Sequence, residues 1–276
     1  MSLTAPVNRD VPEGGESGLL EVTDLSVAFG GVRALNELSL RLEPGEVVGV
    51  VGPNGSGKST LLNAVGGLLK GAQVSGGVSV VGASGRRRAA ALARAGLARS
   101  FQDPKLLEDL TLLDNLMCGA HNSLSGGSLV SLPGSRAARS RRHETERWAL
   151  ELLHAVKLDG EAWDVVAGKP YATRKLTDLL RAFVSRPQLT LLDEPTSGLD
   201  GHDRSVVGQF LRGLRERSST SMVIVEHHFE LLREVADRVV ALSAGRLILS
   251  GPPHEVLDSQ EFRGALTGTA TAAGAD

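Results

Sequence analysis

The sequence is poor in aromatic residues, cysteine, long apolar runs and net charge. Aromatic residues make up 3% of its 276 residues, which argues against a protein that binds its ligand by stacking many rings on it. Cys118 is the single cysteine, so no internal disulfide can form and a reducing, cytosolic compartment is expected. No run approaches the ~18 apolar residues of a membrane-spanning helix. The net charge of −2 gives no general attraction to nucleic acid or to an anionic membrane, and neither is expected to bind through charge.

Glycine, in contrast, is abundant: its 33 residues favour tight turns and close approaches of the backbone. Residues 19–51 have the apolar patterns of β-strands, and from residue 174 onward predicted helices and strands alternate, as in a mostly parallel sheet covered by helices. Residues 86–170 are rich in Ala and Arg and predict helices interrupted by a loop over 119–135. We therefore predict a single α/β domain over 19–264, with a helical subdomain near 86–170 and disordered tails over 1–18 and 265–276.

A phosphate-binding loop pattern lies at residues 52–59, between a Val-rich strand and a predicted helix. Its glycines let the backbone curl until its N–H groups point at phosphate oxygens beside a helix N-terminus. Lys58 can then reach the β- and γ-phosphates, and the Ser59 hydroxyl can bind Mg²⁺. The alternative is a glycine-rich turn that merely joins a strand to a helix. The residues that we assign to nucleotide binding here are Gly52, Pro53, Asn54, Gly55, Ser56, Gly57, Lys58, Ser59 and Thr60.

A second candidate is the apolar strand at residues 189–192, which ends in the adjacent acids Asp193 and Glu194. Asp193 would reach the metal ion from the buried sheet, and Glu194 would poise a water for in-line attack on the γ-phosphate. Paired acids at a strand end are more often solvated turn residues, so this assignment depends on the phosphate loop upstream. Together the two motifs indicate a P-loop nucleoside triphosphatase.

The order and spacing of these motifs and of two further segments resemble those of ATP-binding cassette (ABC) ATPases. The further segments are Ser197-Gly198-Leu199-Asp200 and Val225-Glu226-His227. The resemblance covers about residues 19–257. It implies the ABC ATPase fold: a P-loop NTPase core with a mostly parallel sheet, an antiparallel β subdomain and an inserted helical subdomain.

The resemblance also implies roles for single residues. Phe29 holds the place of the aromatic residue that stacks on adenine. Gln102 holds that of the glutamine that senses the γ-phosphate and Mg²⁺ and links the site to the membrane subunit. His227 matches the switch histidine that contacts the γ-phosphate, and Asp200 matches the aspartate that communicates across the dimer. Taken singly, Phe29 could be a core residue and Gln102 a surface polar residue. Only the presence of all these residues together favours a functional role for each of them.

One segment departs from the family pattern. ABC ATPases carry a signature, commonly Leu-Ser-Gly-Gly-Gln, at the start of the helix that leads to the catalytic strand. Here Pro170, Tyr171, Ala172 and Thr173 stand in the last four places. Pro170 lacks the hydroxyl donor, and the Cβ of Ala172 would obstruct a close backbone approach. Because each ATP lies between the phosphate loop of one subunit and the signature of the other, a heterodimer with a better signature in the partner is favoured over a homodimer.

The resemblance further points to the ATPases of branched-chain amino acid importers, which typically pair two different ATPases. It rests on Tyr171 with Arg174-Lys175, and on the segment 110–116 followed by the basic stretch 136–147. A basic run by itself is usually a solvated helix face.

These features imply an ATPase that uses ATP and Mg²⁺ to drive transport, with Glu194 as general base and Lys58 and His227 stabilising charge on the phosphoryl group. The implied partners are transmembrane permease subunits and a second ABC ATPase, and the implied location is the inner face of the cell membrane. The alternatives are an ATP-binding regulatory cassette with little or no hydrolysis and a soluble, non-transport ABC ATPase. A kinase or GTPase would share the phosphate loop but would not explain Gln102, Asp200 and His227 together.

Overall fold

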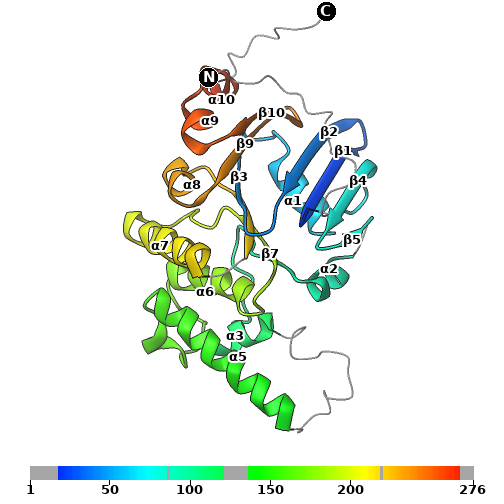
Figure 1. Ribbon diagram of the computed structural model, residues 1–276. Helices are drawn as coiled ribbons and strands as arrows, with labels where there is room; N and C mark the ends of the chain where they lie inside the picture. The colour runs from blue at the N-terminus through cyan, green and yellow to red at the C-terminus, as the bar shows by residue number, and fades with distance from the viewer. Residues whose placement is uncertain (1–17, 86–87, 121–135, 218–219, 268–276) are drawn as a thin grey trace, which may run out of the picture.

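The computed structural model describes residues 18–85, 88–120, 136–217 and 220–267. Two β-sheets and a set of helices form in these residues. Helices α3 (Leu112–Gly119) and α5 (Arg136–Ala155) lie at one end of the molecule, and α9 (Pro253–Asp258) and α10 (Gln260–Thr267) lie at the other (Figure 1). The predicted tail up to residue 17 and residues 121–135 of the predicted loop lie outside the described residues. Within the described ranges, no helix is both long and apolar enough to span a bilayer.

The larger sheet has six strands in the order β10-β9-β3-β8-β7-β6. All neighbouring pairs from β9 to β6 are parallel, and β10 adds an antiparallel strand at one edge. Strands β3, β7 and β8 are buried along their whole length, because near-continuous apolar sequence suits a parallel strand covered on both faces. The mostly parallel sheet predicted from the sequence is confirmed. Its strands are β3 (Val47–Val51), β6 (Leu97–Arg99), β7 (Leu189–Asp193), β8 (Ser221–Val225), β9 (Arg238–Ser243) and β10 (Arg246–Gly251).

The smaller sheet is antiparallel, in the order β2-β1-β4-β5. Its strands are β1 (Leu20–Phe29), β2 (Val32–Leu42), β4 (Gln73–Val80) and β5 (Ala83–Ser84). Helix α1 (Lys58–Val65) packs between the two sheets: its Leu61, Leu62 and Val65 share one buried cluster with apolar residues of β1, β2 and β3. The helix that follows the phosphate loop is therefore fixed by apolar contacts on both sides.

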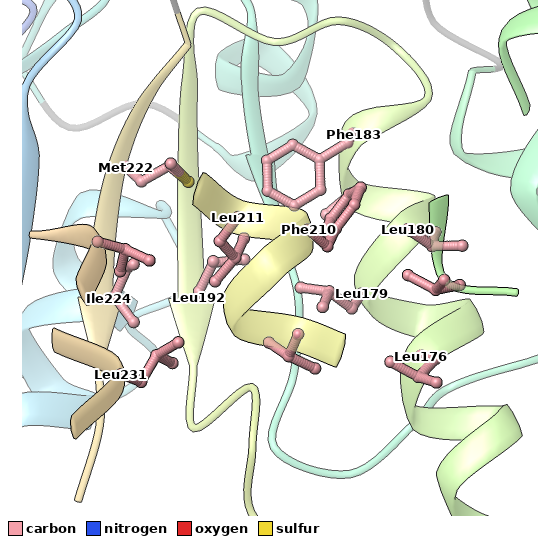
Figure 2. Close-up of a cluster of buried hydrophobic side chains, with 14 of the residues drawn as sticks. Leu176, Leu179, Leu180, Phe183, Leu192, Phe210, Leu211, Met222, Ile224 and Leu231 are labelled. Carbon is pink, nitrogen blue, oxygen red and sulfur yellow. The ribbon is translucent and has the colours of Figure 1, made fainter. Parts of the chain in front are cut away.

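Helices cover the other face of the larger sheet. Figure 2 shows α6 and α7 side by side there, with Leu179 and Phe183 of α6 close to Phe210 of α7. The rings of Phe183 and Phe210 meet edge-on, with centroids 5.5 Å apart. The helices on this face are α6 (Tyr171–Phe183), α7 (Gly201–Arg217) and α8 (Phe229–Val235). Helices α3 (Leu112–Gly119) and α5 (Arg136–Ala155) pack on α6 instead, with the 3₁₀ turn η2 (Asp159–Glu161) against α5, and α2 (Ala89–Ala95) lies beside β6.

Two details differ from the sequence predictions. Strand β6 lies inside the range 86–170 expected to be helical, yet it pairs with β7 and belongs to the larger sheet. Helix α10 (Gln260–Thr267), which follows α9 (Pro253–Asp258), extends three residues into the predicted tail 265–276, because Phe262 and Ala265 bury their side chains. The carboxyl ends of β3, β6, β7 and β8 lie at one edge of the sheet, where α/β proteins bind their ligands.

Candidate nucleotide-binding and catalytic site

The phosphate loop joins β3 to α1, and its glycines adopt backbone conformations that side chains rarely allow. Gly52, Gly55 and Gly57 have φ angles of 151°, 79° and 104°. A Cβ atom at Gly52 would lie 2.2 Å from the carbonyl oxygen of Leu242, and one at Gly57 would lie 2.6 Å from that of Ala34. Bare backbone is therefore required where the loop passes β9 and β2.

Lys58, the first residue of α1, places its ammonium group inside the loop. Its Nζ donates to the carbonyl oxygens of Gly52 at 2.8 Å and Pro53 at 2.9 Å. Burial lowers the pKa of Lys58, and the charges of Glu194 and Asp193 oppose part of that shift. The two acids predicted from the sequence thus act electrostatically on the predicted phosphate-binding lysine.

Three of the predicted catalytic residues meet in one cluster, although they come from loops after three different strands. Glu194 Oε2 accepts a hydrogen bond from Gln102 Nε2 at 3.0 Å, and Glu194 Oε1 lies 2.9 Å from His227 Nε2. The backbone of Glu194 has a φ of 49°, and its N–H donates to the carbonyl of Val225 at 2.9 Å. A left-handed conformation at a non-glycine residue costs about 1 to 3 kcal/mol and is concentrated at functional sites.

Asp193 lies at the buried end of β7 and pairs with an arginine that the sequence reasoning missed. Arg99, at the end of β6, contacts Asp193 Oδ2 at 3.0 Å and donates to Asn63 Oδ1 of α1 at 2.8 Å. Its guanidinium also lies over the ring of Phe101, 5.2 Å from the centroid. Arg99 therefore ties the metal-binding candidate to α1 and to the segment that carries Gln102.

Helix α6 holds that segment through two charged side chains that are buried, a second feature not foreseen. Lys175 Nζ donates to the carbonyls of Phe101, at 3.2 Å, and of Gln102. Asp178 accepts the N–H groups of Phe101 at 3.4 Å and of Lys105 at 3.3 Å. Lys175 and Asp178 are each 2% exposed, and burial lowers the pKa of Lys175. One turn of α6 thus binds both carbonyl groups and N–H groups of the backbone around Gln102.

The degenerate signature lies at the start of the same helix. Pro170 is the N-cap residue of α6 and provides no side-chain cap, which a serine could supply. Tyr171 is 43% exposed; its hydroxyl contacts the carbonyl of Ser197 at 3.4 Å, and a Cβ at Gly198 would lie 2.7 Å from its ring. Ala172 is half-buried and packs against the chain's own core. Tyr171 stands where the family signature has a glycine and is more exposed than Ala172, so it is the larger change to the surface of the signature segment.

The remaining predicted residues are placed as follows. Phe29 ends β1 with 40% of its surface exposed. Ser59 and Thr60 lie in the first turn of α1, the former exposed and the latter half-buried. Asp200 accepts the N–H of Asp203 at 2.9 Å and thereby caps α7, a local role that the sequence comparison did not suggest.

Known proteins similar to this chain identify its family. A family model described as ABC transporter matches residues 35–197, more than half of the chain. BraF of Pseudomonas aeruginosa, a high-affinity branched-chain amino acid transport ATP-binding protein, is 28% identical over 91% of this chain and 98% of its own length. LivG of Salmonella typhimurium, which carries the same description, is 29% identical over the same shares. The Nod factor export ATP-binding protein I of Rhizobium johnstonii is 32% identical, over 91% of this chain and 75% of its own.

Solved structures show the same fold. An ATP-binding cassette of an ABC transporter in its ADP conformation superposes with a TM-score of 0.73 at 24% identity, over 89% of this chain and 96% of that one. A dimeric cassette in a post-hydrolysis state with ADP and Pi gives a TM-score of 0.69 at 25% identity, over 85% and 98%. With the family model over more than half its length, the chain belongs to the ABC transporter family, as an ATP-binding cassette with ATPase activity.

Proposed function

We propose that this protein is the ATP-hydrolysing subunit of a membrane importer of the branched-chain amino acid type. The observation that carries the proposal is the cluster of Gln102, Glu194 and His227. Such a cluster beside a phosphate loop suits a site that orients water toward a terminal phosphate. The substrate class rests on BraF and LivG, whose names describe branched-chain amino acid transport and which match most of this chain.

Each residue has one role in this proposal. Glu194 is the general base that takes a proton from the attacking water. Lys58 and His227 stabilise the charge of the transferring phosphoryl group, and Gln102 senses the γ-phosphate. Phe29 stacks on the adenine ring, for which its exposed position at the end of β1 leaves room.

The loop has the chemistry that a nucleotide with Mg²⁺ requires. Ser56 Oγ is buried without a hydrogen-bond partner in the described part of the chain, and Gly52 leaves no space for a side chain. The first N–H groups of α1 lack partners inside the helix and are available to phosphate oxygens. Ser59, Asp193 and Gln102 would supply the hard oxygen ligands that Mg²⁺ prefers, and the ion would neutralise phosphate charge when bound.

The proposal includes an asymmetric dimer with a second, different ABC ATPase. Pro170 and Tyr171 remove the serine hydroxyl and one glycine from the surface that would close over the partner's nucleotide. Two copies of this chain would therefore form two poor sites. With a partner that has an intact signature, the site built on Lys58, Glu194 and His227 would be complete and only the other site weak.

Restoring the signature tests this assembly. In the purified chain alone, the fourfold variant Pro170→Ser, Tyr171→Gly, Ala172→Gly and Thr173→Gln is expected to raise Mg-ATP turnover well above that of the wild type. Equal turnover by the two proteins alone would contradict the heterodimer and the role given to the signature. Absence of turnover by the wild type with every co-expressed partner would favour a regulatory cassette instead.

A permease subunit is the proposed membrane partner, which places the protein at the cytoplasmic face of the membrane. Leu107, Trp163 and Val165 are exposed apolar residues, with Trp163 at 66% exposure. The segments that carry them are joined by backbone hydrogen bonds from Val166 to Leu110, at 3.0 Å, and from Leu112 to Asp164, at 3.0 Å, just beyond the loop of Gln102. Trp163→Ala is expected to weaken copurification with the permease while ATP binding is retained; unchanged copurification would remove this surface from the proposal.

A further inference from the structure

Glu226 is a buried acid between the end of β8 and His227, and the roles above do not use it. Its side chain is 2% exposed, and its carboxylate accepts four hydrogen bonds. Oε1 accepts from the N–H of Thr196, at 2.9 Å, and from its hydroxyl. Oε2 accepts from the N–H groups of His227 at 2.7 Å and His228 at 3.0 Å. A buried carboxylate with this many donors is strongly held.

The two oxygens serve two different loops. Oε1 binds the loop after β7, two residues beyond Glu194, and Oε2 binds the loop after β8, at the backbone of His227 itself. These are the loops that bring Glu194 Oε1 and His227 Nε2 to within 2.9 Å. One buried side chain therefore joins the backbones of both members of the catalytic pair.

We propose that Glu226 is a positioning residue, which sets the distance between Glu194 and His227 and links it to the segment 196–200, whose Asp200 the family resemblance assigns to communication across the dimer. This inference rests on the catalytic roles proposed above for Glu194 and His227. Because the carboxylate binds both loops, a shift of either loop moves the other, and the pair and the segment 196–200 move as one unit.

The chemistry of the site requires an acid and not merely a side chain of that size. All four groups that face the carboxylate are donors: three are backbone N–H groups, and the Thr196 hydroxyl donates as well. A glutamine in the same place can turn its oxygen to one loop only, and its NH₂ group then meets at least one backbone N–H on the other, because the Thr196 hydroxyl can rotate to accept but an N–H cannot. Glu226→Gln keeps the volume of the side chain but gives up its hydrogen bonds to one loop. The substitution therefore tests the positioning role without creating a packing defect.

The first experiment compares Glu226→Gln with the wild type in the assembly in which the wild type hydrolyses ATP. We expect kcat to fall about 100-fold, the scale of a misplaced catalytic group, and KM for ATP to stay within about twofold. Glu46→Gln is the matched control, because Glu46 also accepts on both oxygens, from Glu43 N–H at 2.9 Å and Arg238 Nε at 2.8 Å, at the opposite end of β3. Its kcat is expected to stay at the wild-type value. Wild-type kcat in folded Glu226→Gln, or an equal loss in Glu46→Gln, would overturn the proposal.

The second experiment does not depend on turnover. In histidine-labelled protein, the imidazole NMR signals of His227, assigned by their loss in His227→Asn, are expected to shift in Glu226→Gln and to stay in place in Glu46→Gln. Unshifted signals would overturn the proposal even in a chain without ATPase activity, so that failure of the proposed function and failure of this inference are distinct. If Glu226→Gln does not fold, Thr196→Val removes a single donor. It should lower kcat about tenfold, the worth of one hydrogen bond to a charged group, and a wild-type rate would count against the inference.

Discussion

The hold of α6 on the segment around Gln102 gives a quantitative prediction for Lys175→Met. Methionine keeps most of the length and the apolar stem of lysine but removes the ammonium group that donates to the carbonyls of Phe101 and Gln102. Because residue 175 is 2% exposed, little water can replace the lost donor. The change therefore affects the backbone on which Gln102 is mounted and leaves the side chain of Gln102 intact.

The magnitude follows from the bonds that are lost. Hydrogen bonds that involve a charged group are worth about 1.5 to 3 kcal/mol each, and two are removed. Burial lowers the pKa of Lys175, which shows that its charge is buried at a cost, and removal of that cost offsets part of the loss. A net loss of about 2 kcal/mol in local stability would raise the equilibrium constant for local opening of this segment about 30-fold.

Amide hydrogen exchange measures that opening directly. The N–H groups of Phe101 and Lys105, which donate to Asp178, should exchange about 30-fold faster in Lys175→Met. Lys169→Met is the control: Lys169 also makes two bonds, to Glu161 at 2.8 Å and Asp164 at 2.6 Å, but these carboxylates are open to water. Unchanged exchange at Phe101 and Lys105, or the same change in the control, would refute the reasoning.

Three further predictions concern other parts of the site. Burial lowers the pKa of Lys58 below its ordinary 10.5, so the unfolded chain binds a proton that the folded chain has released. The free energy of unfolding should therefore rise as the pH approaches 10.5 from neutral, and urea titrations should show a shallower rise for Lys58→Met. Phe29→Ala should weaken ATP binding by about 1 to 3 kcal/mol in a fluorescence titration, with binding of inorganic triphosphate as the unaffected control. Gly198→Ala should lower the free energy of unfolding by about 1 to 3 kcal/mol, because its φ is 77° and the new Cβ would meet the ring of Tyr171. Stability equal to the wild type would show that this contact is dispensable.

The parts of the site that follow local sequence rules were predictable. The phosphate loop needs glycines at fixed spacing. Glu194 directly follows β7 and His227 lies two residues after β8, and these two apolar strands are neighbours in the sheet. Their convergence with Gln102 followed from the resemblance to ABC ATPases and is what the structure shows. The same rules failed for β6, since a three-residue strand inside an Ala- and Arg-rich stretch has no periodic signal.

The supporting side chains could not be inferred in the same way. Lys175 and Asp178 read as ordinary polar residues of an amphipathic helix, and their burial depends on which loop crosses α6. The sequence offers one signal for Glu226: it is an acid that directly follows the five uncharged residues of strand β8. Its partner Thr196 lies 30 positions away, and only the folded sheet brings the two together.

Mg-ATP hydrolysis by Glu194→Gln, beside a separate measurement of ATP binding, tests the central claim most directly. Glutamine can keep both contacts, with its oxygen toward Gln102 Nε2 and its NH₂ group toward His227 Nε2, so the structure of the cluster should persist. The amide cannot take a proton from water, and turnover is predicted to fall about 100- to 10,000-fold while the Kd for ATP stays at the wild-type value. Turnover at the wild-type rate, with ATP still bound, would contradict the assignment of Glu194 as the general base of this site.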